Sequence, residues 1–394
     1  MLNLILSPLQ SCDHERLKHY PCQVYKFTAS PFIHGQDFVE NRKTLILAHA
    51  IVTDSKICQT VPVDFDVIYE VDWNGKLTGF VWDSRTHIDE LGLDKSARDF
   101  ILNPKTIDAQ GWQSFDLTHA NTVAYLGKNK WYSELKDERF NPENIMMSFR
   151  NMGTIIIIEK KTGKVVWRVG PDYENPQFNN LGGPIIGQHM THIIPDGLPG
   201  AGNVLLFDNG SGSGYGGTKG YATHARGYSR ILEFNPVTLE RVWEYTNDGF
   251  YSSVISGVQR LPNGNTLICE GVGSRVFEVT PAKEMVWEIK DDVVTINKPE
   301  AGQGYTLMSF SMTQTVLLDM SGTVIKTWDL NNFPAKMLPD GSIIASIIAE
   351  AAKSGGPAAG PPAGQKSSYR ALRVPPEWVP GNPSGYVKWA NLYR

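Results

Sequence analysis

The chain has 394 residues, of which 41% are apolar and 20% charged, and it contains 37 glycines and 24 prolines. This length supports a large apolar core, and the glycine and proline content is typical of a fold with many tight turns. A net charge of −4 provides no overall field for nucleic acid or an anionic membrane, so we expect neither as a partner. The sequence has no run of about 18 or more apolar residues, and we therefore expect no membrane-spanning helix.

The N-terminal stretch and the cysteines leave the compartment open. Residues 1–12 are apolar, but they contain no basic residue and include Pro8, so they do not make a convincing signal peptide. The cysteines show neither a CxxC pair nor the spacing of metal ligands, and we expect buried free thiols, with a disulfide between two of them undetermined. They are Cys12, Cys22, Cys58 and Cys269.

One motif recurs along the chain: an apolar strand, a turn, and a second strand that ends in tryptophan. Its copies end at Trp82, Trp167, Trp243, Trp287 and Trp328. These tryptophans lie 85, 76, 44 and 41 residues apart. The last two gaps indicate a repeat of about 40 residues, and the first two are longer because insertions separate the units.

A second motif alternates with the first: a short strand, a Pro-Asp-Gly or Pro-Asn-Gly turn, and another strand. It is clearest at 188–210, 257–271 and 333–346, with weaker copies at 33–50 and 119–151. Two hairpins per repeat make a four-stranded unit that cannot bury both its faces alone, which is typical of a β-propeller blade. We therefore predict an all-β fold, a β-propeller of six blades, five of which are clear from the sequence. Two stacked β-sandwiches are the alternative.

Two segments interrupt the repeat. Residues 83–118 contain charged, helix-compatible sequence and predict a helical and loop excursion over one face of the disc. Residues 350–368 are rich in Ala, Gly, Pro and Ser and indicate a linker. We expect a propeller domain at 1–349, this linker, and a C-terminal strand and tail at 369–394 that pack on the propeller.

Histidines recur at one position of the repeat. In a propeller the innermost strand of each blade lines the central channel, so equivalent positions face the same space. Six residues before the turn proline Pro195 stands His189, and the corresponding positions of earlier units hold His119 and, less securely, His34. A single histidine at the start of a strand is often only structural. Three at equivalent positions predict a shared site in one funnel.

A second register lies at the far end of the next strand, where Arg150, Asn209 and His49 occupy equivalent positions. Arg150 follows an apolar strand, and a lone arginine is expensive to bury there unless an anion meets it. The alternative is a salt bridge at the surface or between blades. The register therefore favours an anion site and leaves a structural role open.

Imidazoles and a guanidinium in one funnel indicate a site for a small oxyanion. Arginine offers a planar fork of donors, and histidine donates hydrogen bonds, transfers protons or attacks as a nucleophile. Asn121, two residues after His119 and on the same strand face, adds an uncharged donor. Three histidines would equally suit a divalent metal, but Arg150 beside them disfavours a cation. We expect neither a metal nor a cofactor.

These residues resemble the arylsulfate sulfotransferase family over roughly residues 30–290, with a detached piece at 369–383. The family's elements occur in order: a His-x-Asn segment, a strand ending in arginine, a Thr-Gly hairpin with tryptophan, and a Gln-His strand. They are residues 119–121, 148–150, 159–170 and 188–189. The resemblance implies a six-bladed propeller that moves a sulfuryl group from an aryl sulfate to a phenolic acceptor without a nucleotide. It also implies a periplasmic or secreted protein.

The resemblance further implies roles for single residues. His189 would be the nucleophile that is transiently sulfated, while His119, Asn121 and Arg150 would hold the sulfate oxygens. The resemblance also implies an upstream histidine in the same pocket, and His34 matches it better than His49 or His87. Further candidates for binding the sulfate or substrate are Gln188, Asn209 and His192.

Two other functions stay open from the sequence. One is a metal-assisted hydrolase or lactonase that uses the same funnel, and the other is a non-catalytic propeller that binds a ligand or partner through its loops. The sequence does not specify the natural donor, the natural acceptor or the oligomeric state.

Overall fold

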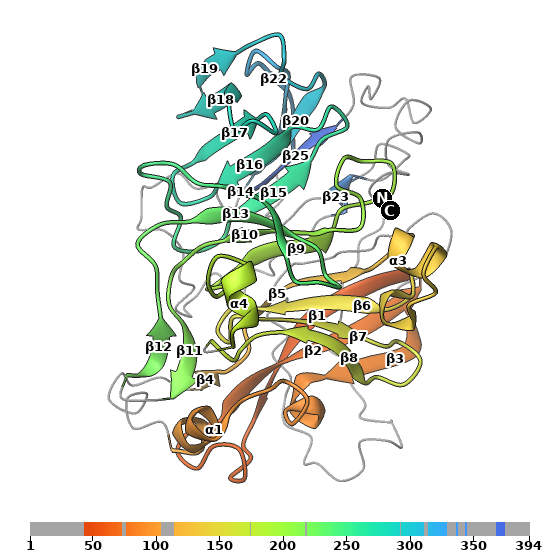
Figure 1. Cartoon of the computed structure of the whole chain (residues 1–394), viewed down its shortest axis with the longest axis vertical. Helices are drawn as coiled ribbons and strands as arrows, with labels where there is room; N and C mark the ends of the chain where they lie inside the picture. The colour runs from red at the N-terminus through yellow and green to blue at the C-terminus, as the bar shows by residue number, and fades with distance from the viewer. Residues whose placement is uncertain are drawn as a thin grey trace.

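The structure is a computed structural model in which most of the chain from residue 43 to residue 328 is described. The described residues are 43–72, 76–103, 114–173, 175–216, 219–291, 293–310, 314–328, 336–337, 343–344 and 368–374. Nearly all regular structure within them is β-strand, in antiparallel sheets that follow one another along the chain (Figure 1). The all-β prediction is confirmed.

The first two sheets come from the N-terminal part of the described chain. The first contains β1 (Lys43–Val52), β2 (Val63–Asp72), β3 (Leu77–Asp83) and the short β4 (Phe115–Asp116), which pairs parallel to β2. The second is an antiparallel meander of β5 (Ala120–Tyr125), β6 (Ile145–Phe149), β7 (Thr154–Ile158) and β8 (Val165–Val169).

The third and fourth sheets repeat this meander. The third has the order β14 (Arg241–Tyr245), β13 (Arg230–Phe234), β10 (Val204–Asp208), β9 (His189–Ile193). A separate hairpin of β11 (Ser213–Gly216) and β12 (Gly220–His224) is inserted between β10 and β13. The fourth contains β15 (Gly257–Arg260), β16 (Thr266–Glu270), β17 (Arg275–Val279), β18 (Met285–Lys290) and β19 (Val293–Asn297).

The fifth sheet joins distant parts of the chain. Its order is β22 (Val324–Trp328), β21 (Gln314–Leu318), β20 (Tyr305–Phe310), β25 (Ser368–Val374), so its edge strand comes from the C-terminal segment. A two-stranded hairpin of β23 (Lys336–Met337) and β24 (Ile343–Ile344) stands apart. The predicted linker at 350–368 lies outside the described residues except for Ser368.

Helices are short and lie between strands. The excursion predicted at 83–118 is confirmed: it contains the 3-10 turn η2 (Ser84–His87) and α1 (Lys95–Leu102), whose first turn is capped by the Asp94 carboxylate. The others are α3 (Lys130–Ser133), η3 (Glu138–Phe140) and α4 (Gln177–Asn180).

Central strands are buried on both faces, because side chains of neighbouring residues enter different cores. Met146 packs in the core between the second and third sheets, and Met147 in the core between the first and second. On β10, Leu205 and Leu206 likewise divide between two cores. The alternation of side chains along these strands therefore binds the second and third sheets to the sheets on both sides of them.

Edge strands of successive sheets lie next to one another: β1 contacts β5, β5 contacts β9, β9 contacts β15, and β15 contacts β25. Each sheet thus offers one edge to a common region, as the inner strands of propeller blades do. The sheets have the build of propeller blades, and the number six stays a prediction.

The tryptophans of the repeat fasten each sheet to the next. In the first four of them, the indole N–H donates to a backbone carbonyl in the outer hairpin turn of the following sheet, which provides a partner for the indole. The pairs are Trp82 with Gly163, Trp167 with Pro236, Trp243 with Pro281, and Trp287 with Met320, at 2.9, 2.8, 2.9 and 3.0 Å. The spacing of the tryptophans along the chain therefore follows the order of the sheets.

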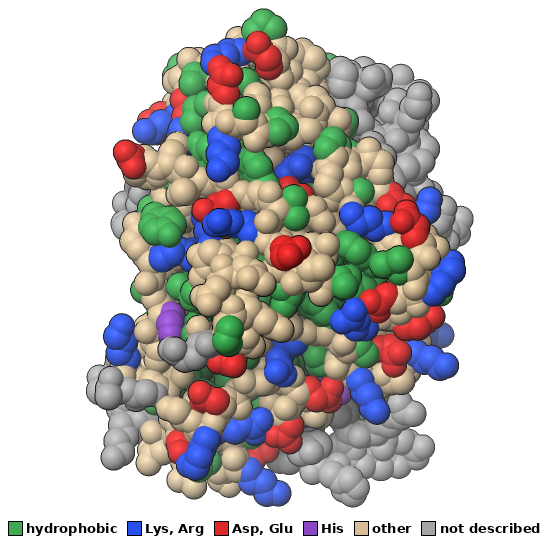
Figure 2. Space-filling view, viewed as in Figure 1, with side chains coloured by type: hydrophobic (Ala, Val, Ile, Leu, Met, Phe, Trp, Pro, Cys, Tyr) green, Lys and Arg blue, Asp and Glu red, His purple; other side chains and the backbone are tan. Residues whose placement is uncertain are grey.

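The composition led to expectations about cysteines, membrane spans and charge, which can be compared with the structure. Cys58 and Cys269 are buried free thiols, while Cys12 and Cys22 lie outside the described residues. None of the described helices combines the length and apolarity needed to cross a membrane. On the face shown in Figure 2, basic and acidic side chains are interspersed, without a large area of one sign.

Candidate functional site

His119 stands immediately before β5, in a backbone conformation that its neighbours fix. Its φ is +50°, a left-handed conformation that non-glycine residues seldom adopt. The fully buried carboxylate of Asp66 accepts hydrogen bonds from the Thr118 hydroxyl at 2.5 Å and the Ala120 N–H at 2.7 Å, on both sides of His119. Asp66 therefore holds the strained turn that presents the imidazole.

Arg150 follows the end of β6 and lies against the same turn. Its backbone N–H donates to the His119 carbonyl at 3.0 Å. Its guanidinium donates to Asn151 Oδ1 at 2.8 Å, to Ser211 Oγ at 3.1 Å and to the Gly212 carbonyl at 3.5 Å. Within the described part of the chain Arg150 forms no ion pair. The structure thus provides no counter-charge for this half-buried cation among those residues.

The entry to β9 places His189 against the loop that holds Arg150. Gly187 has a φ of +66°, and a Cβ on it would stand 2.5 Å from the Ser211 carbonyl oxygen, so only glycine fits. One residue earlier, the Ile186 N–H donates to the buried carboxylate of Asp208 at 2.8 Å. Asp208 in turn pairs with the buried guanidinium of Arg230 at 2.9 Å. These contacts bring the Gln-His segment beside Ser211, which binds Arg150.

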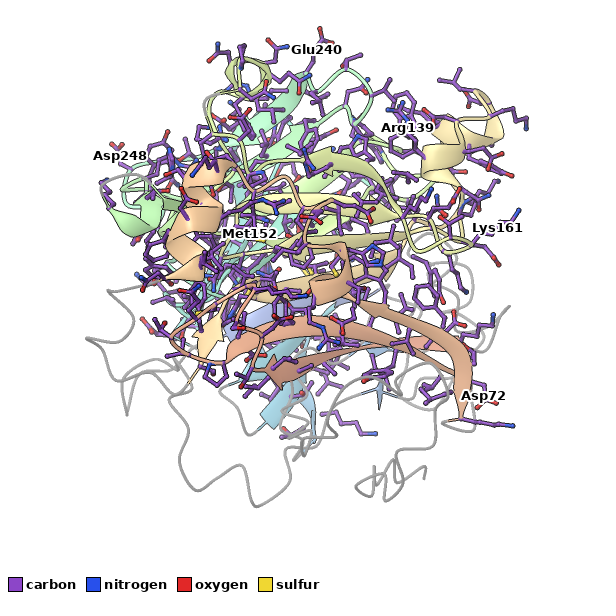
Figure 3. All side chains as sticks on the ribbon, turned by 90° about the horizontal axis from the view of Figure 1, so that it is seen from below. Asp72, Arg139, Met152, Lys161, Glu240 and Asp248 are labelled. Carbon is purple, nitrogen blue, oxygen red and sulfur yellow. The ribbon has the colours of Figure 1, made fainter. Side chains whose placement is uncertain are left out.

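The position of Met152 shows where the turn between β6 and β7 lies in the protein. It belongs to the turn between β6 and β7 that follows Arg150, and it is fully buried. Figure 3 shows Met152 within the body of the protein, whereas Lys161, in the turn at the other end of β7, lies at the periphery. The turn carrying Arg150 therefore points inward.

His189 is electrically neutral in this environment. Its pKa is lowered to about 3, mainly by burial and in smaller part by the positive charges of Arg150 and His119, while hydrogen bonds to Asn209 and Gly187 oppose this shift. Its Nδ1 lies 2.7 Å from Asn209 Oδ1 and 3.2 Å from the Gly187 carbonyl oxygen. The Arg150 N–H donates to the His119 carbonyl at 3.0 Å, and Arg150 and Gly187, the residue two before His189, both lie against Ser211. The three residues therefore lie in one region, and a shared site stays a prediction.

Asp116 is a residue that the sequence reasoning missed. Its carboxylate lies in hydrogen-bond contact with His119 Nδ1, three residues later. The His119 side chain is 44% exposed, so its other nitrogen is not sealed from solvent. A carboxylate on Nδ1 orients an imidazole and makes it a better proton carrier. The spacing Asp-x-x-His is the feature of the sequence that could have indicated this pair.

The other predicted residues near His189 are Asn121, Gln188 and His192, and each forms hydrogen bonds to other residues of the fold. The Asn121 amide donates to the Gln188 carbonyl at 2.6 Å, which ties β5 to the start of β9. The Gln188 amide donates to the Ser148 hydroxyl at 2.9 Å and to two backbone carbonyls of the second sheet. His192, half-buried on β9, contacts the Met190 carbonyl through Nδ1 at 2.9 Å. The contacts of Asn121 and Gln188 join the second and third sheets, whereas that of His192 lies within β9.

The upstream histidines are not brought to this group by any described contact. His87, in η2, stacks on Trp82 of the outer strand β3 with ring centroids 4.9 Å apart, and its Nδ1 lies 2.8 Å from the Glu90 carboxylate. The backbone of His49 lies in β1, the strand that contacts β5, but its side chain is outside the described residues. His34 also lies outside them.

Aromatic side chains, which the repeat analysis did not single out, lie over the Arg150 loop. Tyr173 stacks on His224 with centroids 3.9 Å apart. Its hydroxyl contacts the Met152 carbonyl at 2.8 Å and the Ser213 hydroxyl at 2.9 Å, and burial raises its pKa. His224 of the inserted hairpin β11–β12 thus forms, with Tyr173, an aromatic surface beside the loop that carries Arg150.

Among the described residues, no group of three or more His, Cys, Asp or Glu side chains is arranged to hold a metal ion. The side chains that do converge are the guanidinium of Arg150, the neutral imidazole of His189, and the imidazole of His119 with the Asp116 carboxylate on its Nδ1. Such a set is suited to the oxygens of a small tetrahedral anion beside an aromatic surface.

A model of the arylsulfotransferase (ASST) family matches residues 20–305, well over half of the chain. The match contains the strands and turns that carry His119, Arg150 and His189. The chain belongs to the arylsulfotransferase family, and the suspected resemblance is confirmed. Family membership supports arylsulfate sulfotransferase activity in general and small-molecule substrates.

Comparison with curated proteins gives no match. Among solved structures, a protein of unknown function from Bacteroides caccae is similar, with 16% identity and a TM-score of 0.40, over 77% of this chain and 85% of that one. BamB from Moraxella catarrhalis has 9% identity and a TM-score of 0.34, over 82% and 80%. Virginiamycin B lyase from Staphylococcus aureus has 11% identity and a TM-score of 0.31, over 73% and 74%. Likenesses of this size carry no argument about function.

The lowered pKa of His189 makes a prediction about acid stability. In the folded chain the ring stays neutral down to about pH 3, whereas in the unfolded chain it binds a proton below about 6.5. The unfolded state binds more protons in this window, so stability falls as the pH is lowered through it, by at most about 1.4 kcal/mol per pH unit from this residue.

We expect His189→Ala to remove this part of the acid sensitivity. The difference in unfolding free energy between wild type and variant, measured by urea unfolding at several pH values, narrows as the pH falls from about 6.5 to about 4.5. A difference that stays constant over this range contradicts the neutral, buried imidazole.

Proposed function

We propose that this chain transfers a sulfuryl group from an aryl sulfate to a phenol through a sulfated His189. The observation that carries the proposal is a buried, neutral imidazole beside a guanidinium without a described counter-charge. A neutral imidazole has the lone pair that a nucleophile needs, and a guanidinium stabilises the oxygens of a sulfuryl group. Membership of the arylsulfotransferase family supports the same reaction class.

In the first half-reaction, His189 Nε2 attacks the sulfur of the aryl sulfate. The new N–S bond forms as the S–O bond to the aryl group breaks. Arg150 stabilises the negative charge on the sulfuryl oxygens, which is the main electrostatic contribution. His119, held by Asp116, donates a proton to the departing phenolate, which leaves as the phenol.

In the second half-reaction, a phenolic acceptor replaces the first phenol. Neutral His119 accepts the phenol proton, and the phenolate oxygen attacks sulfur as the N–S bond breaks. His189 returns to its neutral form, and the new aryl sulfate leaves. The aromatic rings of Tyr173 and His224 provide a surface for the aryl group of donor and acceptor.

Initial rates with 4-nitrophenyl sulfate as donor and phenol as acceptor test this proposal. We expect coloured 4-nitrophenol to be released in dependence on phenol, with parallel double-reciprocal lines as the acceptor concentration is varied. Release that occurs only after a divalent metal is added supports instead the metal-assisted hydrolase. The absence of turnover with any donor and acceptor pair favours a binding propeller and overturns the proposal.

A further inference from the structure

Asn209 is turned so that its amide oxygen faces His189. Its side-chain NH2 group donates to two backbone carbonyls of the loop before β15, those of Ser252 at 2.8 Å and Ile255 at 3.0 Å. Carbonyl oxygens only accept, so both amide hydrogens point to this loop. The amide oxygen is therefore the atom that lies 2.7 Å from His189 Nδ1.

This orientation fixes the position of the proton on His189. Nδ1 lies between two acceptors, the amide oxygen of Asn209 and the carbonyl oxygen of Gly187 at 3.2 Å. An unprotonated nitrogen there would face two oxygens without a hydrogen, so the neutral ring carries its proton on Nδ1. The lone pair is then on Nε2, the nitrogen turned away from both acceptors.

The carbonyls that orient Asn209 are themselves held in a strained loop. Ile255 and Ser256 have φ values of +52° and +93°, and a β-branched residue in that region is a clear outlier. The Ser256 hydroxyl accepts from the Gly271 N–H at 3.1 Å and bonds the Ser252 hydroxyl at 2.9 Å. Hydrogen bonds from the fourth sheet thus maintain a backbone conformation that directs the Ile255 carbonyl to Asn209.

The third sheet closes the same arrangement from the other side. The Ser229 hydroxyl donates to the backbone carbonyl of Asn209 at 2.8 Å and accepts from the Ser252 N–H at 2.9 Å. Asn209 is fully buried, so every polar atom of its side chain requires a partner within the fold. The loop before β15 holds the NH2 group of the side-chain amide, and His189 Nδ1 holds its oxygen. The amide therefore does not rotate to offer a donor to substrate.

We infer that Asn209 is a positioning residue that holds His189 in the Nδ1-protonated tautomer and thereby makes Nε2 the sulfur-attacking atom. This inference rests on the proposed function for its consequence, but the tautomer is a property of the resting protein. It assigns to Asn209 a role in orienting the nucleophile, in place of the sulfate contact expected from the repeat register. Free imidazole side chains favour the opposite tautomer, so the assignment is distinctive.

The test is long-range 1H–15N correlation NMR of the full chain labelled with 15N-histidine, at neutral pH and without substrate. The signal of His189 is identified by its loss in His189→Ala. We expect the pattern of a protonated Nδ1 and an unprotonated Nε2. A wild-type ring with its proton on Nε2 overturns the inference, whether or not the protein transfers sulfuryl groups.

Asn209→Ala extends the test to the mechanism. We expect part of the His189 population to move its proton to Nε2 and the single-turnover rate of protein sulfation to fall by about 10- to 100-fold. Asn144→Ala is the matched control, because Asn144 is equally buried and its amide donates to two backbone carbonyls, those of Glu138 and Arg139. It should lower stability but leave the His189 spectrum unchanged.

The outcomes separate the inference from the proposed function. A protonated Nδ1 in wild type that persists unchanged in Asn209→Ala contradicts the role of Asn209, even where sulfation is normal. A protonated Nδ1 that depends on Asn209, without any sulfation by aryl sulfates, supports the positioning role and contradicts only the proposed reaction.

Discussion

Replacing His189 by alanine is expected to reduce sulfuryl transfer by at least about 10⁴-fold, because it removes the group that accepts the sulfuryl group in the proposed mechanism. Loss of a nucleophile stops both half-reactions, so the phenol-dependent release of 4-nitrophenol disappears. The same variant should no longer gain the mass of one SO3 group when it is exposed to an aryl sulfate. In wild type, that mass appears on the peptide that contains His189.

The stability of the variant distinguishes a catalytic from a structural role. Removing a buried imidazole leaves a cavity, and we expect a loss of roughly 1–3 kcal/mol in unfolding free energy at neutral pH, with the fold retained. Thr191→Ala is the control, since Thr191 is equally buried two residues later on β9. It should keep most of the activity. Normal transfer by His189→Ala, or sulfation of another residue, contradicts the mechanism.

The tryptophan repeat explains why the fold was predictable from the sequence. Each tryptophan must meet both a packing surface and an acceptor for its N–H, and the following sheet supplies both through a turn such as that of Gly163. The chain therefore repeats the residue wherever one sheet docks on the next. The period of the sheets could be read directly from this single residue type.

The edge strand of the fifth sheet shows where periodicity stops being informative. β25 pairs with β20 although roughly 60 residues separate them, and β23 and β24 form their own hairpin rather than joining that sheet. Pairing across such a distance depends on register and on packing with β15 and β16. Neither is contained in the local pattern of a strand.

The prediction of the site relies on the same repeat. His119, Arg150 and Asn209 follow from their positions in the repeat, because equivalent positions reach one region of the fold. The contacts of Ser211 with Arg150 and of Tyr173 with His224 lie outside the repeat, so its periodicity does not predict them. The role of Asn209 also depends on the Ile255 carbonyl, which is set by backbone conformation and not by residue type.

Replacing Arg150 by methionine is expected to lower kcat/KM for the aryl sulfate by about 10²–10³-fold. Methionine fills similar space without charge, so the sulfuryl oxygens lose their principal donor. Arg150→Lys restores the charge but not the planar fork, and we expect it to recover only part of the loss. Arg139→Met is the matched control, since Arg139 pairs with Asp137 on a neighbouring turn and is labelled in Figure 3 at a distance from Met152.

The same substitution has an electrostatic consequence for His189. The positive charge of Arg150 lowers the pKa of His189, after the larger effect of burial. Without that charge the pKa rises, so the fraction of neutral nucleophile begins to fall at a higher pH. We expect the acidic limb of the kcat profile of Arg150→Met to shift upward relative to wild type, whereas Arg150→Lys leaves it in place. Coincident acidic limbs in Arg150→Met and wild type, or a kcat/KM within tenfold of wild type, contradict a guanidinium that acts on both the sulfuryl group and the histidine.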